Sequence, residues 1–101
     1  MLARVTTFMG GAEHIDEGLA MFRDTALPEI EHQPGFDGAL FLTDPEDRIV
    51  YAITFWETEA DLRASAGLSK RLADTAGRQF GSKTETDSCE VALSTIPALV
   101  G

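Results

Sequence analysis

The apolar positions of this chain change their period along its length, and each period predicts one kind of element. Residues 2–8 are rich in β-branched and apolar side chains and stop at a glycine pair, which predicts a first strand. Apolar residues then recur every three or four positions, as on one face of an amphipathic helix: Ile15, Leu19, Phe22, Ala26 and Ile30. Pro28 interrupts this stripe and predicts a kink or restart near Leu27. The turn pair Pro34-Gly35 predicts that the helix has ended before it.

The middle of the chain predicts a hairpin followed by a second helix. Residues 36–42 and 49–56 are strand-like, and Asp44-Pro45 between them has the turn chemistry that joins two antiparallel strands. Thr58 begins a variant of the capping box, which predicts a helix start. Apolar residues at helical spacing continue this helix to about Phe80.

Residues 86–96 complete the pattern as a predicted fourth strand. The order strand, helix, strand, strand, helix, strand is the ferredoxin-like arrangement, an α+β fold in which two helices cover one face of a four-stranded antiparallel sheet. The length predicts a single domain over residues 1–101.

The predicted third strand is apolar on both of its faces. Ile49, Tyr51, Ile53 and Phe55 alternate with Val50, Ala52, Thr54 and Trp56. Two helices cover one face of the sheet, so the other face requires a further protein surface. We therefore expect a homodimer that forms through the sheet face.

Composition and charge narrow the classes of partner. The chain has 17 acidic and 8 basic residues and a net charge of −9, which argues against a nucleic-acid partner, since binding to phosphates normally needs a basic surface. No apolar run is long enough for a membrane helix, and the first residues lack a signal-peptide pattern, so we expect a cytoplasmic protein with no membrane partner. The lone Cys89 is interpreted as a buried structural thiol.

Two segments resemble the antibiotic-biosynthesis-monooxygenase-type dimeric α+β barrels. They are PEIEHQPGFDGALFLTD and YAITFWETEADLRAS, and their most specific parts are residues 33–36 and 56–62. The resemblance implies two ferredoxin-like sheets that face each other in a dimer, with a cavity in each subunit between its own sheet and helices. This superfamily includes oxygenases without cofactors, haem-degrading enzymes and isomerases, so its fold does not fix one activity.

The same resemblance places Trp56 in the cavity wall and turns its face of the strand toward the helices. Quinone-forming members carry polar side chains four positions before and six positions after this tryptophan, where this chain has Ala52 and Leu62. Haem-degrading members use an Asn on the first strand and a Trp and a His on the second helix. The nearest matches here are Arg4, Ser65 and Thr75, so haem degradation is not expected.

The predicted pocket is mostly apolar and suits a flat aromatic molecule. Its candidate walls are Trp56, Phe22, Ala52, Leu62 and Phe80, and its candidate polar contacts are Thr54, Arg4 and His32. Each has a plainer alternative. Trp56 is equally suited to core packing, Arg4 to the outer face of the sheet, and His32 to a solvent-facing or capping position.

No residue of the sequence can be named as catalytic. His14 and His32 are 18 positions apart, about 27 Å on an unbroken helix, so they cannot share a metal ion, and no metal site is expected. Nucleophile motifs and glycine-rich phosphate loops are missing from the sequence. The function that fits best is a small monooxygenase that acts on a phenol-like molecule without a recognised cofactor. The alternatives are a non-catalytic dimer that binds an apolar small molecule and, third, an isomerase or lyase.

Overall fold

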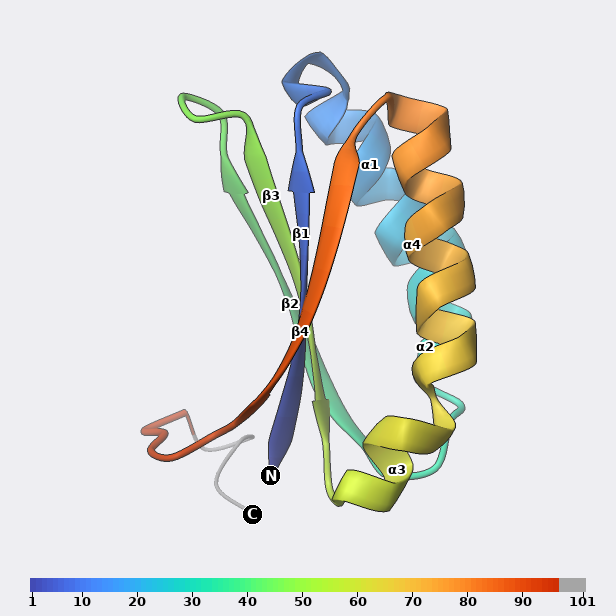
Figure 1. Cartoon of the computed structure of the whole chain (residues 1–101), viewed down its shortest axis with the longest axis vertical. Coiled ribbons are helices and arrows are strands. Elements are labelled where there is room, and N and C mark those ends of the chain that lie inside the picture. The colour runs from blue at the N-terminus through green and yellow to red at the C-terminus, as the bar shows by residue number, and fades with distance from the viewer. Residues whose placement is uncertain (97–101) are drawn as a thin grey trace.

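The structure is a computed structural model that describes residues 1–96. Four strands and two helical arms follow each other in the predicted order (Figure 1). The elements are β1 (Leu2–Met9), α1 (Ile15–Met21), a π-helical turn (Phe22–Ala26), α2 (Leu27–Ile30), β2 (Phe36–Asp44), β3 (Ile49–Trp56), α3 (Glu59–Ala64), α4 (Ala66–Phe80) and β4 (Lys83–Glu90).

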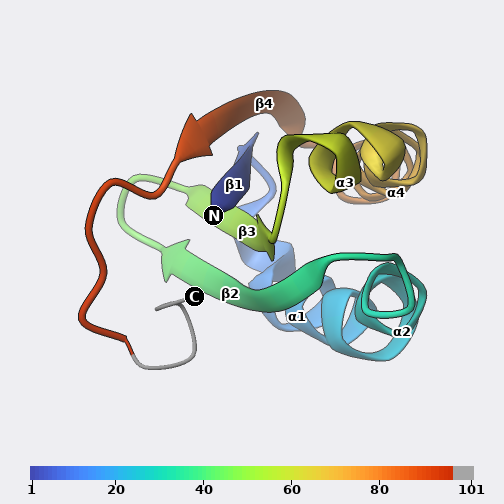
Figure 2. The same cartoon turned by 90° about the horizontal axis from the view of Figure 1, so that it is seen from below.

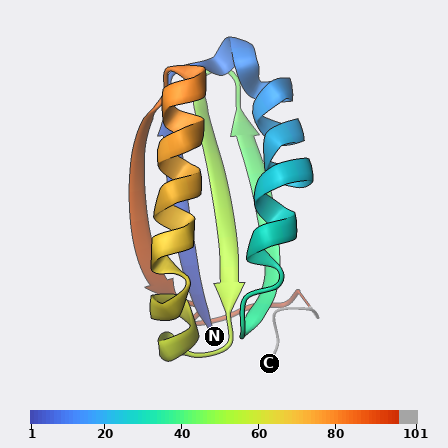
Figure 3. The same cartoon turned by 90° about the vertical axis from the view of Figure 1, so that its right-hand side faces the viewer.

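The strands form one antiparallel sheet in the order β2-β3-β1-β4, with both helical arms on the same face. The two arms lie side by side across the sheet (Figure 3). A view from below shows that residues 1–96 place no helix over the other face (Figure 2). In the register of β1 and β3, Arg4 lies opposite Thr54 and Thr6 opposite Ala52, so these side chains share the helix-facing side. The ferredoxin-like prediction is confirmed.

The helices deviate from the predicted rods at two places. The first arm widens into the π-helical turn at Phe22–Ala26, which ends two residues before Pro28, in the region where a kink was predicted. The second arm breaks at Ser65, which separates α3 from α4. Thr58 caps α3 as predicted, because its hydroxyl accepts a hydrogen bond from the backbone N–H of Asp61.

The prediction for the last strand was wrong in its position. β4 covers Lys83–Glu90, and residues 91–96 are not a strand. Strand pairing explains the difference, since β4 pairs with β1 from Met9 to Leu2. Past this register, the N–H of Val91 still donates to the carbonyl oxygen of Met1 at 3.0 Å. Gly81 ends α4 with a left-handed backbone at φ 67°, so β4 can begin almost at once.

The core lies between the sheet and the helices, near the C-terminal end of α2 and the N-terminal end of α4. Trp56 is completely buried there and packs with Ala26, Ile30 and Leu62, while the ring of Phe36 meets the indole edge-on at 5.8 Å.

The outer face of the sheet is only partly covered by the described chain. Met1 and Val91 pack over Ala3 and Phe55, so Phe55 is buried by its own subunit. Leu40 and Leu42 remain exposed on this face. The interpretation of Cys89 as a buried thiol was wrong: Cys89 is exposed, because β4 is an edge strand and this position faces away from the helices.

Candidate functional site

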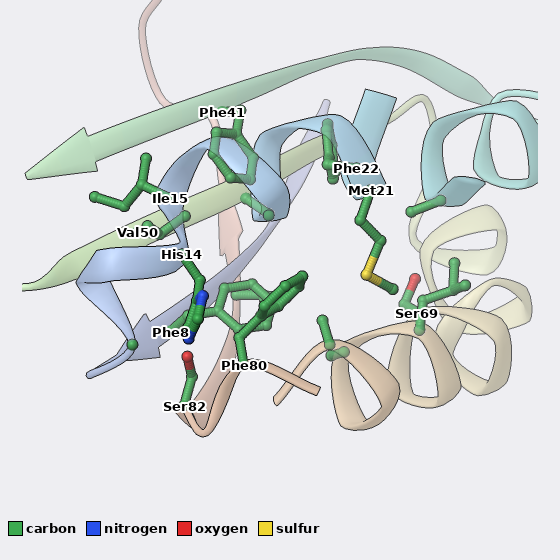
Figure 4. A pocket seen from close by; sticks show the side chains of 18 of the residues that line it. Phe8, His14, Ile15, Met21, Phe22, Phe41, Val50, Ser69, Phe80 and Ser82 are labelled. Carbon is green, nitrogen blue, oxygen red and sulfur yellow. The ribbon is translucent and has the colours of Figure 1, made fainter. Parts of the chain in front are cut away.

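A cavity of about 90 Å³ lies between the sheet and the two helical arms. Its floor comes from β1 and β3, which contribute alternate residues such as Thr6 and Ala52. Its walls are mostly aliphatic and aromatic side chains of the helices and of β2 (Figure 4). The close-up shows His14, Phe8, Phe80 and Ser82 clustered at one side of the cavity and Ser69 at the other. An apolar space with a few polar groups is the usual form of a small-molecule site.

Arg4 is the cation in the wall of this cavity. Its side chain points toward the helices from β1, and the residue is only 5% exposed. Nη1 donates hydrogen bonds of 2.8 Å to the hydroxyl oxygens of Ser65 and Ser69, and Nη2 donates one to the carbonyl oxygen of Leu62. The guanidinium carbon lies 5.7 Å from the ring centre of Trp56.

The break between α3 and α4 creates this set of acceptors. The hydroxyl of Ser65, at the break, donates to the carbonyl oxygen of Leu62, and that same carbonyl also accepts from Arg4. Ser69 lies one turn further along α4 and therefore presents its hydroxyl on the same side. The local sequence thus folds into a cradle of neutral oxygens around a charged group.

The charge of Arg4 is not matched by an acid among the residues that the structure describes. Within residues 1–96, no carboxylate forms a salt bridge with this guanidinium. Burial lowers the pKa of Arg4 from its ordinary value, because the charged form loses hydration. A buried cation held by neutral acceptors is suited to attracting an anionic ligand.

His14 is the second titratable side chain in the cavity wall. Its Nδ1 lies 2.7 Å from a carboxylate oxygen of Glu17, and its ring centre is 5.9 Å from that of Phe80. A carboxylate at Nδ1 orients an imidazole and favours the tautomer whose Nε2 can accept a proton. The cavity wall therefore contains one fixed cation and one imidazole that a carboxylate orients.

Five of the eight residues proposed from the sequence line the cavity, and they come from both helical arms, β1 and β3. They are Arg4, Phe22, Ala52, Thr54 and Phe80. Of the two orientations considered for Arg4, toward the pocket or toward the outer face of the sheet, the structure shows the first. Whether any of these residues binds a substrate stays a prediction.

The other three lie outside the cavity lining. Trp56 belongs to the packed core with Leu62, and its indole N–H donates to the hydroxyl of Thr54 at 2.9 Å. Leu62 lies in α3, one turn before the break, and packs against that indole instead of the cavity. His32 is exposed after the end of α2, where its Nδ1 bonds the carbonyl oxygen of Pro28. Helix α2 ends at Ile30, so this histidine lies in the turn that leads to β2.

Sequence reasoning missed several lining residues. Thr6 and Phe8 follow Arg4 at alternate positions of β1. Because alternate residues of a strand share one face, an inward Arg4 would have predicted that Thr6 and Phe8 also point inward. Ser69 could have been found from its spacing of four to Ser65. His14 had no such signal, because its place at the cavity depends on how the start of the first arm meets the end of α4.

Two classes of site are not seen in the described part of the chain. Residues 1–96 contain no group of three or more His, Cys, Asp or Glu side chains placed to hold a metal ion. No helix among them is long and apolar enough to span a membrane.

Comparison with known proteins relates the chain to proteins of the same fold. No family model matches the sequence. The uncharacterised protein Rv2557 of Mycobacterium tuberculosis is 30% identical over 90 residues, which are 89% of this chain and 40% of that protein. The chain thus spans less than half the length of the curated relatives it matches.

Three solved structures share the architecture over nearly the whole chain. SnoaB, a cofactor-independent oxygenase from Streptomyces nogalater, has a TM-score of 0.65 and 22% identity, covering 95% of this chain and 96% of SnoaB. The haem degrader MhuD of Mycobacterium tuberculosis, with two haems bound in its active site, has a TM-score of 0.70 and 21% identity, covering 93% and 98%. An antibiotic biosynthesis monooxygenase has a TM-score of 0.68 and 17% identity, covering 92% and 100%. The chain has the fold of the antibiotic-biosynthesis-monooxygenase-like α+β proteins, and at these identities the likeness concerns the fold alone.

Proposed function

We propose that this protein is a small monooxygenase that acts on a phenol-like aromatic molecule without a recognised cofactor. The observation that carries the proposal is the buried guanidinium of Arg4, unmatched by a carboxylate within residues 1–96, in the wall of an otherwise apolar cavity. The fold shared with SnoaB, a cofactor-independent oxygenase, supports this choice of chemistry.

Arg4 attracts the negative charge of the ligand from the side of the cavity near Ser69, opposite His14. A desolvated cation that lacks a counter-ion raises the free energy of the empty site, and an anion entering the cavity offsets that cost. The surrounding apolar walls bury the aromatic rings, while the cation fixes their orientation. The volume of about 90 Å³ is small beside the roughly 300–1,000 Å³ of pockets for drug-sized ligands, which favours one or two fused rings.

His14 supplies the proton acceptor that the reaction needs. A phenol hydroxyl at this side of the cavity loses its proton to the imidazole, whose positive charge is then balanced by Glu17. The phenolate gives an electron to dioxygen, and the two radicals combine to form the new carbon–oxygen bond. The carbon loses its hydrogen, the second oxygen atom leaves as water, and the product is a quinone. The chain contributes positioning and charge to these steps.

Haem degradation is the less favoured activity, although MhuD has the same fold. Helix α4 contains no histidine that could ligate the iron, and the cavity is too small for a porphyrin.

Cytoplasmic location also remains a proposal from the sequence.

The active form is proposed to be a homodimer that joins the outer faces of two sheets. Ile49, Tyr51 and Ile53 lie on this face and are half-buried in the single chain, beside the exposed Leu40 and Leu42. A contiguous apolar surface of this kind is typical of a permanent interface.

A non-catalytic binding protein is the second candidate. It is favoured by Ala52, which places a methyl group in the cavity where quinone-forming members carry a polar side chain. In that case the cavity would bind the same aromatic anions, and no oxygen would be consumed.

Oxygen uptake separates the two candidates. The wild-type protein is mixed with phenols and naphthols, and oxygen is followed by electrode beside the fluorescence of Trp56. The proposal expects saturable uptake that falls about a hundredfold in His14→Gln, within the usual contribution of a general base. His32→Gln is the matched control, because His32 is exposed and outside the cavity. Fluorescence quenching without uptake would favour the binding protein, and the absence of both would contradict the site.

A further inference from the structure

A second hollow, which is lined mainly by polar and small side chains, lies between α4 and β4. This groove has a volume of about 500 Å³. The strand contributes hydroxyl side chains from its helix-facing positions, namely Thr84, Thr86 and Ser88. The helix contributes small residues, Ala66, Ser69 and Ala73, and the pair Lys70–Asp74. Thr86 and Ser88 are exposed at these positions, so the groove is open to solvent and its hydroxyls can contact a polar occupant.

The groove and the cavity meet at the same three residues. Arg4, Ser69 and Ala73 line both spaces. The two linings therefore share only Arg4 and two small side chains of α4. A ligand that occupied both spaces would contact Arg4.

Arg4 has donors left for a ligand. Nη1 uses both of its hydrogens on Ser65 and Ser69, and Nη2 uses one on the carbonyl oxygen of Leu62. The Nε–H and the second Nη2–H have no acceptor among residues 1–96. These two adjacent donors form the edge of a guanidinium that a carboxylate engages with two parallel hydrogen bonds.

The charge of the groove matches a single negative charge. Lys70 is paired with Asp74 at 2.8 Å, so within residues 1–96 Arg4 is the cation of the lining that has no acidic partner. A carboxylate brings one charge, whereas a phosphate ester brings nearly two. The hydroxyls of β4 can donate to carboxylate oxygens without adding charge.

We propose that the α4–β4 groove is a subsite for a carboxylate-bearing arm of the aromatic ligand. This inference rests on the proposed function, since it assumes that the cavity binds the rings of that ligand. The aromatic part occupies the apolar cavity with its hydroxyl toward His14, and the arm passes Ser69 so that its carboxylate binds Arg4 from the groove. The substrate class is thereby narrowed from phenols in general to phenolic carboxylic acids.

The test compares two ligands on two variants. The ligands are naphthol and a naphthol that carries a propanoate arm, and binding is measured by quenching of Trp56, which lies beside Arg4. Thr86→Asp places a negative charge in the groove. Thr43→Asp is the matched control. Thr43 is also an exposed threonine on the helix-facing side of the sheet, but it lies on β2, the opposite edge strand, and does not line the groove.

The wild type and Thr43→Asp are expected to bind the armed naphthol about tenfold more tightly than naphthol, and Thr86→Asp is expected to lose this preference while its naphthol affinity is unchanged. Equal binding of the two ligands by the wild type, or a preference that survives in Thr86→Asp, would overturn the subsite and leave the proposed function standing. Failure of both ligands to bind would overturn the subsite together with the proposed function.

Discussion

Filling the cavity from its floor should abolish ligand binding without unfolding the protein. Ala52 is buried in the centre of β3, and its methyl group lines the cavity. An empty space of 90 Å³ costs the folded state about 2 kcal/mol at roughly 24 cal/mol per Å³. In Ala52→Leu, three added carbon atoms regain about 2.4 kcal/mol by burial, and lost rotamer freedom and strain remove about 1.5–3 kcal/mol. The free energy of unfolding should therefore stay within about 1 kcal/mol of the wild type.

The assay is urea unfolding followed by Trp56 fluorescence, beside calorimetric titration with naphthol. Ala60→Leu is the control, because Ala60 is exposed on α3 and its substitution should leave both measurements unchanged. A loss of more than about 2 kcal/mol in Ala52→Leu is the usual result of overpacking a filled core, and it would refute the cavity. Undiminished naphthol binding in a stable Ala52→Leu variant would place the ligand elsewhere.

Three further predictions concern the dimer, the haem and the pH dependence of stability. Ile53→Asp should raise the dissociation constant of the dimer at least about a hundredfold, because it buries an unpaired carboxylate; light scattering at micromolar concentration would show an unchanged dimer if this is wrong. Hemin should give no sharp stoichiometric Soret shift, whereas a shift that is lost on replacing His14 would place an iron ligand in the cavity. Because the pKa of Arg4 is lowered in the folded protein, its charged form destabilises the folded state at every pH below that pKa. This destabilisation decreases only when the pH rises through the lowered pKa. Between about pH 6 and 9, unfolding free energies of the wild type and Arg4→Met should therefore run parallel, and curves that diverge in this window would contradict the assignment.

The sequence predicted the parts of the fold that depend on local periodicity and turn chemistry. The limits of β3 and the cap at Thr58 were confirmed because alternation and capping are local signals. The position of β4 was wrong because strand pairing with β1 decides it, and this pairing is a long-range contact. Cys89 was misjudged for the same reason, since its exposure depends on the edge position of β4.

The candidate site was harder to predict than the fold. Residue type and spacing identified inward positions such as Ala52 and Thr54, but they could not decide whether a tryptophan packs in the core or lines a cavity. Trp56 packs in the core because Leu62 and Ile30 cover it from two separate helices. His14 reaches the cavity through the meeting of two distant segments, for which no local pattern exists.

Arg4 is proposed to select aromatic anions, and calorimetry with a charged and a neutral ligand of the same shape measures this selection. Naphthoate and its methyl ester are titrated into the wild type and into Arg4→Met, a substitution that removes the charge and keeps much of the side-chain volume. We expect the wild type to bind naphthoate at least about tenfold more tightly than the ester, as for a charge-assisted hydrogen bond, and we expect Arg4→Met to lose this preference. Equal affinity of the wild type for both ligands, or an anion preference that survives in Arg4→Met, would contradict this proposal.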